Sequence, residues 1–306
     1  MYYAWYAPQA QLARRSRDGW INSSLSSLGR YEMEKSAARP APLPRQAEDA
    51  PLVYFLSGKK FWYQTLFCAY SLAKQASLPI GFSIVDDGTL STKNVETLSR
   101  ILVGCKIIFR ERIEDQLEQH LPKQQFPTLR ARRLVYPHIR KLTDVHVGSR
   151  GWKLVLDSDM LFHRQPVFLE QWLQCPSVPL NMRDIANSYG YSDAIMRSLA
   201  GAEIPERLNV GVCGLQSDSI DWTKLEHWCR ELTTREGSHY LQEQALVAML
   251  LAGKPRSEAP ACDAIVAPSR TETTFPSAAL HHYVAESKTW YFRFAWRNVQ
   301  ARSQQR

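Results

Sequence analysis

The sequence feature that most constrains this chain is a short apolar strand that ends on two acids. Residues 154–156 read Leu-Val-Leu, and Asp157 and Asp159 follow at once with a single serine between them. A strand without polar alternation is typical of a parallel sheet covered by helices on both faces. Open α/β sheets bind their ligands beyond the carboxyl ends of such strands. We therefore expect the two aspartates to lie at a ligand site.

Two carboxylates placed so close together need compensation for their charge. Each would lose water on burial and would repel the other. A hard divalent cation, Mg²⁺ or Mn²⁺, held by the carboxylates and by the phosphates of a substrate, is the simplest compensation. The alternative is an acidic turn that closes the strand and binds nothing.

The composition is that of a globular protein with ample core. The chain has 306 residues, of which 44% are hydrophobic and 22% charged, so it can hold one large domain or two small ones. It lacks an apolar stretch of roughly 18 residues, and its aromatic N-terminal residues precede the basic ones, the reverse of a secretory signal. We expect a cytoplasmic protein.

The six cysteines are scattered without a CxxC pair, which favours free thiols over a disulfide framework or a zinc knuckle. His227 and Cys229 have no second pair of ligands near them in the sequence, so we do not expect zinc there.

Basic residues are concentrated between residues 100 and 153. This stretch contains twelve basic and five acidic residues, a net charge of +7 against +8 for the whole chain. Such a patch is suited to a nucleoside diphosphate or to peripheral contact with an anionic membrane. Nucleic acid is not expected, because the patch contains few aromatic rings on which bases could stack: Phe109, Phe126, Tyr136 and Trp152. A solvated helical face with no partner is the alternative.

The order of periodic segments predicts an α/β fold. Residues 1–50 lack a sustained period and are rich in Ala and Pro toward their end, which indicates a flexible or extended leader. Apolar strands then alternate with helical patterns over residues 51–300, with a proline break at Pro137. We expect one domain there, with a mixed, mostly parallel sheet and helices on both faces.

Other candidates for the same sheet edge follow from this arrangement. Asp86 and Asp87 end a strand, where one of them could bind a ribose or a base, although Asp-Asp-Gly is also ordinary turn chemistry. Arg130, Arg133 and Lys141 could share a helical face turned toward that edge.

Four stretches follow one another along the chain: the strand-borne DSD at 157–159, LNVG at 208–211, QEQA at 242–245, and a final pattern in which Lys288, Thr289 and Trp290 follow His282 after five residues. Taken in this order, they resemble retaining glycosyltransferases of the GT-A fold, especially the family-eight group of glycogenin and bacterial galactosyltransferases. Together they span roughly residues 52–290. The chain departs from the family where Ala245 stands for Asp, Glu243 for Asp, Ala285 for Gly and Thr289 for Pro, which marks a divergent branch.

The resemblance implies a nucleoside-diphosphate sugar as donor, an acceptor that is a saccharide, a lipid-linked sugar or a protein, and a bound Mn²⁺ or Mg²⁺. It implies metal ligation by Asp157, Asp159 and His282. Donor contacts would come from Asp157, Gly211 and Lys288, together with the candidates Asp86, Asp87 and Arg133. Roles in catalysis would fall to Asn209, Glu243 and Gln244 near the sugar.

One part of this ligand set also follows from strand geometry. Side chains alternate along a strand, so only one of His281 and His282 can face the site, and the spacing to Lys288 selects His282. An ordinary core histidine is the alternative.

Retention of configuration is expected by resemblance, through front-face attack or a covalent intermediate. An inverting enzyme would need a base such as Asp184 or Asp193. Two other classes compete with a glycosyltransferase. A sugar-phosphate nucleotidyltransferase would carry a glycine-rich loop after its first strand, which residues 57–62 match poorly. A non-catalytic nucleotide-sugar or anion-binding module would have no need of paired acids.

Overall fold

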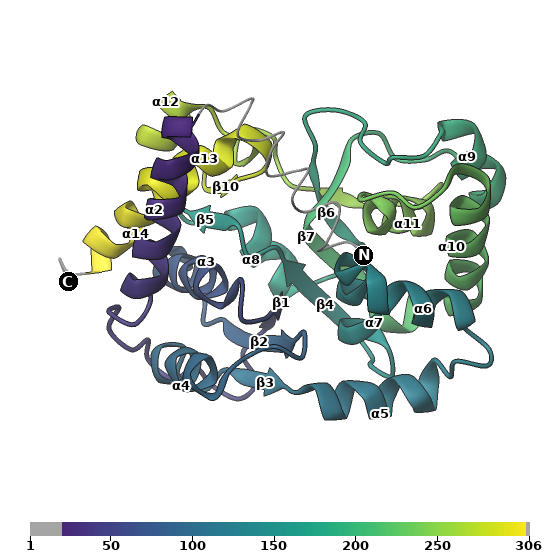
Figure 1. The fold of residues 1–306 in the computed structure, drawn as a ribbon, viewed down its shortest axis with the longest axis horizontal. Helices are drawn as coiled ribbons and strands as arrows, with labels where there is room; N and C mark the ends of the chain where they lie inside the picture. Colours follow the sequence, from purple (N-terminus) through teal and green to yellow (C-terminus); the bar gives the residue numbers. More distant parts are fainter. Residues whose placement is uncertain (1–19, 304–306) are drawn as a thin grey trace.

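Strands with both faces buried build the central sheet of this protein. The computed structural model describes residues 20–303, and the sheet runs through its middle (Figure 1). The strand order is β3 (Lys106–Ile108), β2 (Gly81–Asp86), β1 (Leu52–Ser57), β4 (Trp152–Leu156), β7 (Leu208–Gln216), β6 (Leu180–Arg183) and β8 (Ser257–Glu258). The pairs of β7 with β4 and with β6 are antiparallel and the other four pairs are parallel, which confirms the predicted sheet.

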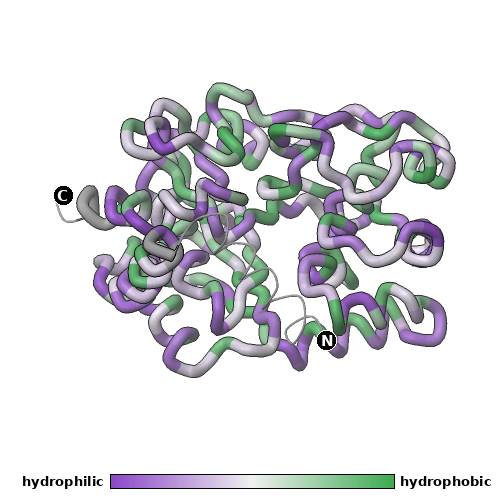
Figure 2. Tube along the Cα trace, turned by 45° about the horizontal axis from the view of Figure 1, so that its top comes forward, coloured by the Kyte–Doolittle hydropathy of each residue, from purple (hydrophilic) through white to green (hydrophobic). Residues whose placement is uncertain are grey.

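Alternation along the strands divides the core in two. Val53 and Phe55 of β1 and Leu154 of β4 pack toward α3 (Trp62–Gln75), α4 (Thr92–Ile101) and α8 (Val167–Gln174). Val155 packs on the other face, toward the remaining large helices. These are α5 (Arg110–His120), α6 (Pro127–Val135), α7 (Arg140–His146), α9 (Asp193–Ala200), α10 (Trp222–Glu236) and α11 (Gln242–Leu250). Each buried Val, Leu or Phe side chain contributes about 1.5–3 kcal/mol, so both layers hold the sheet. Figure 2 shows hydrophobic and hydrophilic stretches alternating along the Cα trace, with hydrophobic stretches running through its interior.

A second, three-stranded sheet continues directly from the first. Its order is β5 (Met160–Phe162), β10 (Leu280–His282) and β9 (Ala264–Val266). Only residues 157–159 separate β4 from β5, so the chain leaves one sheet and enters the other within three residues. The antiparallel pairing of β10 with β5 sets His282 opposite Met160. The acidic triplet therefore lies at the junction of the two sheets.

Two helix boundaries follow the local sequence signals. Ser91 caps α4, where its side chain accepts from the Asn94 N–H while the Asn94 side chain accepts from the Ser91 N–H. Pro137 separates α6 from α7 through the short helix η2 (Pro137–Ile139), as the proline break predicts.

Residues 1–50 were expected to form a flexible or extended leader, and the part of them that the structure describes includes a helix. Residues 1–19 lie outside the described residues, but α2 (Trp20–Ser36) is a 17-residue helix against the C-terminal segment (Figure 1). Gly29 and Met33 of this helix and Ala37 directly after it are buried, a narrow stripe at four-residue steps, and Met33 belongs to the same core as the sheet. Leu28 and Tyr31, two of its large apolar residues, are more than half exposed. The spacing of the large apolar residues in the sequence therefore did not indicate which face of this helix is buried.

The basic aromatic end of the chain is also helical. It forms η4 (Ala285–Ser287), α13 (Lys288–Trp290), η5 (Tyr291–Ala295) and α14 (Trp296–Ser303). Tyr291, Phe292 and Trp296 are buried, and the Trp296 ring packs 5.5 Å from that of Phe67 on α3. The tail is thus part of the core on one face of the sheet.

Two expectations from composition can be compared with residues 20–303. All six cysteines are free thiols. In this described part of the chain, none of the helices combines the length and the apolar character needed to cross a membrane.

The contact of α2 with the C-terminal segment gives a test of the fold. A Cβ at Gly29 would collide with the backbone carbonyl of Phe292. We expect Gly29→Ala to lower the free energy of unfolding by about 1–3 kcal/mol, because neither backbone can give way cheaply. Ser24→Ala, at an exposed position of the same helix, should change it by less than about 0.5 kcal/mol. Urea unfolding of both variants makes the comparison, and equal stability of Gly29→Ala and wild type would contradict this packing.

Candidate metal and diphosphate site

Segments far apart in the sequence bring two carboxylates and an imidazole together. Asp157 follows β4, and its N–H donates to the Gly211 carbonyl of β7 at 2.9 Å. The carbonyl of Asp159 accepts from the Tyr283 N–H at 2.9 Å, which fixes β10 against the acidic triplet. The Nε2 atom of His282 then lies 3.3 Å from Asp159 Oδ1 and 3.6 Å from Asp157 Oδ2.

These three side chains form a set that could hold a metal ion. Each offers one ligand atom, and the three atoms lie within 4.8 Å of one another. Two carboxylate oxygens and one imidazole nitrogen suit Mn²⁺, while Mg²⁺ has the stronger preference for oxygen. His282 is 3% exposed, and its Nδ1 has no hydrogen-bond partner among the described residues. The imidazole is therefore directed to the acids through Nε2 alone.

Two lysines compensate the charge of the acids, one at each carboxylate. Lys288 Nζ lies 2.9 Å from Asp159 Oδ2, and Lys141 Nζ lies 2.8 Å from Asp157 Oδ1. Burial alone would raise the pKa of Asp159, but Lys288 and His282 outweigh it and hold that pKa well below its ordinary value. The acid is therefore ionised and ready to bind a cation.

Lys141 also connects the triplet to α11. Its Nζ lies 3.2 Å from Glu243 Oε2, and both side chains are buried. Burial opposes the charge on Lys141, but Asp157 and Glu243 outweigh it and raise the pKa of the ammonium. Burial, with the nearby Asp157 charge, raises the pKa of Glu243 to about 7 despite the attraction of Lys141. A single buried cation thus serves two carboxylates.

A chain of hydroxyl groups anchors the triplet to the first βα unit. The Ser158 Oγ lies 2.7 Å from the Thr65 Oγ1 of α3, which lies 2.7 Å from the Ser57 Oγ at the end of β1. This fixes the serine between the two acids to α3 and to the end of β1.

The amides expected near the sugar gather around another acid. The Asn209 amide donates to Asp184 Oδ2 at 3.0 Å, and the Gln244 amide donates to the same oxygen at 3.3 Å. Gln244 also donates to the Ser188 carbonyl at 2.8 Å. Asp184, which the sequence offered only as a base for an inverting enzyme, is the common partner of both amides. Asp193, the other candidate base, is instead exposed and pairs with Arg197.

Asp86 and Asp87 lie at the same sheet edge but are engaged in their own turn. One oxygen of Asp86 accepts from the N–H groups of Gly88, Thr89 and Leu90 at 2.9–3.1 Å. Asp87 accepts from the Thr89 hydroxyl and N–H, and its carboxylate lies against Gly58 just beyond β1. Both residues therefore stabilise their own turn, and a contact with the sugar-nucleotide donor stays a prediction.

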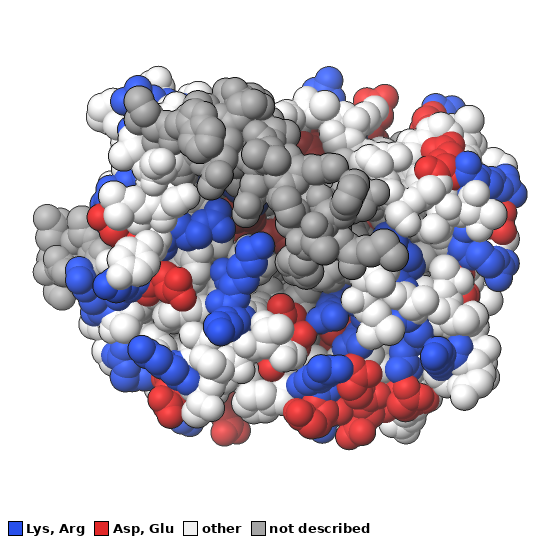
Figure 3. All heavy atoms as spheres, in the orientation of Figure 1, with Lys and Arg blue, Asp and Glu red and all other residues white. Residues whose placement is uncertain are grey.

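Arg133 has partners other than the site. Its guanidinium makes two hydrogen bonds to Asp144, at 2.6 and 2.9 Å, and one to Glu114 at 2.8 Å. The α6–α7 region instead contributes Lys141, which the sequence singled out only as one of three cations on a common face. Neighbouring charges on α5 are also paired, and Figure 3 shows acidic and basic side chains intermingled there. Part of the basic patch is therefore neutralised within the protein.

Glycine is required at residue 211 by the closeness of this packing. A Cβ there would lie 2.5 Å from His282 Nδ1 and 2.9 Å from Asn209 Oδ1. The position thus separates the metal-ligand candidates from the amides, and any side chain would displace one or the other.

The two histidines of β10 point to opposite sides. While His282 faces the acids, His281 Nε2 lies 2.8 Å from Glu272 Oε1 of α12 (Arg270–Thr274). The Glu272 carboxylate also accepts from Ser277 N–H and Oγ–H, at 2.7 and 2.8 Å, and from Ala278 N–H at 3.1 Å. Glu272 therefore fixes β10 and, through it, His282.

Comparison with solved structures identifies the fold. A galactosyltransferase, LgtC, in complex with donor and acceptor sugar analogs has a TM-score of 0.55 at 15% identity, over 83% of this chain and 95% of that one. Mouse xyloside xylosyltransferase 1 has a TM-score of 0.50 at 13% identity, over 75% and 96%. The bifunctional glycosyltransferase WbbM has 0.52 at 10% identity, over 85% of this chain and 53% of that one.

At these identities the comparisons show a shared fold, and the predicted GT-A fold is confirmed. No protein-family model matches the chain, and no curated protein matches it.

The close approach at Gly211 predicts a selective loss of metal affinity. In Gly211→Ala the new methyl group should displace the His282 ring, and we expect Mn²⁺ affinity to fall by at least about tenfold, or 1.4 kcal/mol. Titration of Mn²⁺ followed by electron paramagnetic resonance measures it.

Gly214→Ala is the matched control for this prediction. A Cβ at Gly214 of the same strand would lie 2.6 Å from the Trp172 ring, away from the acids, so it strains β7 without moving His282. Equal Mn²⁺ affinity in the two variants would contradict the proposed role of the glycine.

The Glu272 contacts predict a loss of stability in acid. Burial raises the pKa of the Glu272 carboxyl, but hydrogen bonds from Ser277, His281 and Ala278 outweigh it and hold that pKa at about 2, below its ordinary 4.5. Its contribution is therefore complete above pH 4.5 and is lost as the pH falls toward 2.

We expect Glu272→Gln to cost about 1–3 kcal/mol at neutral pH, and the difference from wild type to shrink in acid. Glu286→Gln, at an exposed position, should cost little at any pH. Urea unfolding between pH 7 and pH 2 gives the comparison, and a difference that does not change with pH would be contrary to this account.

Proposed function

We propose that this protein is a metal-dependent glycosyltransferase that moves a sugar from a nucleoside-diphosphate sugar to an acceptor hydroxyl, with retention. The observation that supports this most is the convergence of Asp157, Asp159 and His282, with Lys288 and Lys141 beside them, at the carboxyl edge of the sheet. The fold shared with glycosyltransferases agrees with it. These three side chains fit a divalent cation, since carboxylate oxygens and an imidazole nitrogen are ligands that Mn²⁺ accepts.

The division of charge at the site suits a departing diphosphate. When bound, a divalent cation supplies Lewis-acid neutralisation of the phosphate oxygens. Asp157, Asp159 and His282 would hold it. Lys288 pairs with Asp159 in the structure, and a cation on that acid would free its ammonium to bind a phosphate oxygen. The site then collects positive charge where negative charge develops as the glycosidic bond breaks.

The sugar would lie between the triplet and α11. Glu243 and Gln244 come from the same helix. Lys141 forms ion pairs with both Glu243 and Asp157, so it fixes the acid beside the sugar relative to the acid beside the diphosphate. Asp184 orients the amides of Asn209 and Gln244, which can then donate to sugar hydroxyls or accept from them. A buried Glu243 is suited to stabilise positive charge at the anomeric carbon once it is ionised.

Asp159→Asn tests the proposal. With Mn²⁺ and a panel of nucleotide sugars, we expect the wild type to release nucleoside diphosphate and Asp159→Asn to do so at least about 100-fold more slowly, a loss of roughly 2.7 kcal/mol in transition-state stabilisation. Asp263→Asn is the control, because the side chain of this aspartate forms an exposed ion pair with Arg164.

Unfolding curves establish that both variants are folded. Unchanged turnover in folded Asp159→Asn would sink the proposal, and release of pyrophosphate from a nucleoside triphosphate and a sugar phosphate would indicate a nucleotidyltransferase instead. The anomeric configuration of the product, read by NMR, decides retention.

A further inference from the structure

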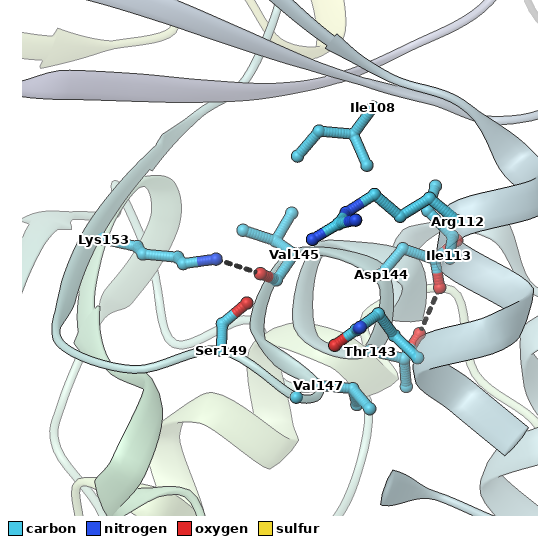
Figure 4. A pocket seen from close by; sticks show the side chains of 11 residues that line it. Ile108, Arg112, Ile113, Thr143, Asp144, Val145, Val147, Ser149 and Lys153 are labelled. Atoms are coloured by element: carbon cyan, nitrogen blue, oxygen red, sulfur yellow. Dashed lines mark hydrogen bonds between the residues drawn. The ribbon is translucent and has the colours of Figure 1, made fainter. Parts of the chain in front are cut away.

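A cavity lies beside α7, away from the acidic triplet. It has a volume of about 160 Å³, opens to solvent, and is lined by the end of β3, by α5, by α7 with the turn after it, and by the start of β4. Ile108, Ile113, Val145 and Val147 give it an apolar wall. Figure 4 shows these side chains around the opening.

Two cations line this cavity. Figure 4 shows the Arg112 guanidinium and the Lys153 ammonium entering from opposite sides. Lys153 is 7% exposed, and its ammonium donates to the Val145 carbonyl and lies 4.7 Å from the centre of the Tyr54 ring. Within residues 20–303, neither Lys153 nor Arg112 forms an ion pair with a carboxylate. Burying an ammonium without a counter-ion is costly, and the pKa of Lys153 is lowered to about 8 by burial.

The acid that lines the cavity does not neutralise these cations. The Asp144 side chain is fully buried. Its carboxylate accepts hydrogen bonds from the Arg133 guanidinium at 2.6 and 2.9 Å and from the Thr143 hydroxyl at 2.7 Å. Its charge is thus matched by Arg133. The cavity is left with two positive charges, an apolar wall, and the hydroxyl of Ser149 and the amide of Gln116 as further polar groups.

The cavity is separate from the site proposed for the nucleotide sugar. Lys153 lies near the start of β4 (Trp152–Leu156), whereas Asp157 follows its end. Likewise Lys141 lies in the first turn of α7 and faces the triplet, whereas Thr143, Asp144 and Val145 line the cavity. The same strand and the same helix therefore contribute to both places with different residues.

We propose that this cavity binds a compact anion, a phosphate or carboxylate group with at most a small apolar substituent. The anion would be held between Lys153 and Arg112, and its substituent would rest on the apolar wall. An ionised oxygen accepting from both cations makes charge-assisted hydrogen bonds in a partly buried place, where they are strongest. This supplies the counter-charge that Lys153 lacks.

Hydrogen exchange with inorganic phosphate and, separately, isobutyrate tests the proposal on the full chain. We expect at least one of these probes to protect α5 and the backbone of residues 147–149. Arg112→Gln and Lys153→Met should each weaken that protection by about tenfold in apparent affinity, or 1.4 kcal/mol. The probe that binds tells a phosphate ligand from a carboxylate ligand.

Lys288→Met controls for phosphate bound near the acidic triplet and should leave the protection of α5 unchanged. Arg112 is exposed, so Arg112→Gln decides the result if Lys153→Met fails to fold. Protection by neither probe, or equal protection in folded Arg112→Gln and wild type, would overturn the proposal.

Discussion

The mutual repulsion of Asp157 and Asp159 is the constraint on which the rest of the site depends. Two carboxylates at the end of a buried strand are stable only if positive charge is brought to them. The protein does this with Lys141 from α7 and Lys288 from the C-terminal segment, while His282 from β10 places its Nε2 beside both acids. Helices and strands remote in sequence are thus fixed around one pair of acids, and a divalent cation would complete the compensation.

The junction of the two sheets makes this convergence possible. Because the acidic triplet lies directly between β4 and β5, a strand that pairs with β5 is brought alongside the acids. β10 is that strand, and Glu272 stabilises it from behind through His281. On the other side, Gly211 lets β7 approach His282 without a side chain between them. The precision of the site therefore comes from backbone pairing, with the polar contacts added to it.

The sequence was informative where function imposes a local pattern and uninformative where tertiary contacts decide. An apolar strand before Asp157 and the spacing of His282 from Lys288 were enough to nominate residues that the structure brings together. Arg133 and Lys141 could not be told apart, because their roles depend on how α6 and α7 meet the sheet. The helix α2 was missed because it buries only a narrow stripe that includes Gly29 and Met33. Asp184 became notable only through the two amides that it orients.

The position of a bound cation tests the account most directly. Crystals grown with Mn²⁺ and a nucleoside diphosphate, measured at the manganese absorption edge, should show one anomalous peak about 2.1 Å from an oxygen of Asp157, an oxygen of Asp159 and the Nε2 of His282. The Lys288 ammonium should then have left Asp159 for a phosphate oxygen. A peak elsewhere, or a diphosphate bound with the Lys288–Asp159 pair intact and no metal between the acids, would contradict it.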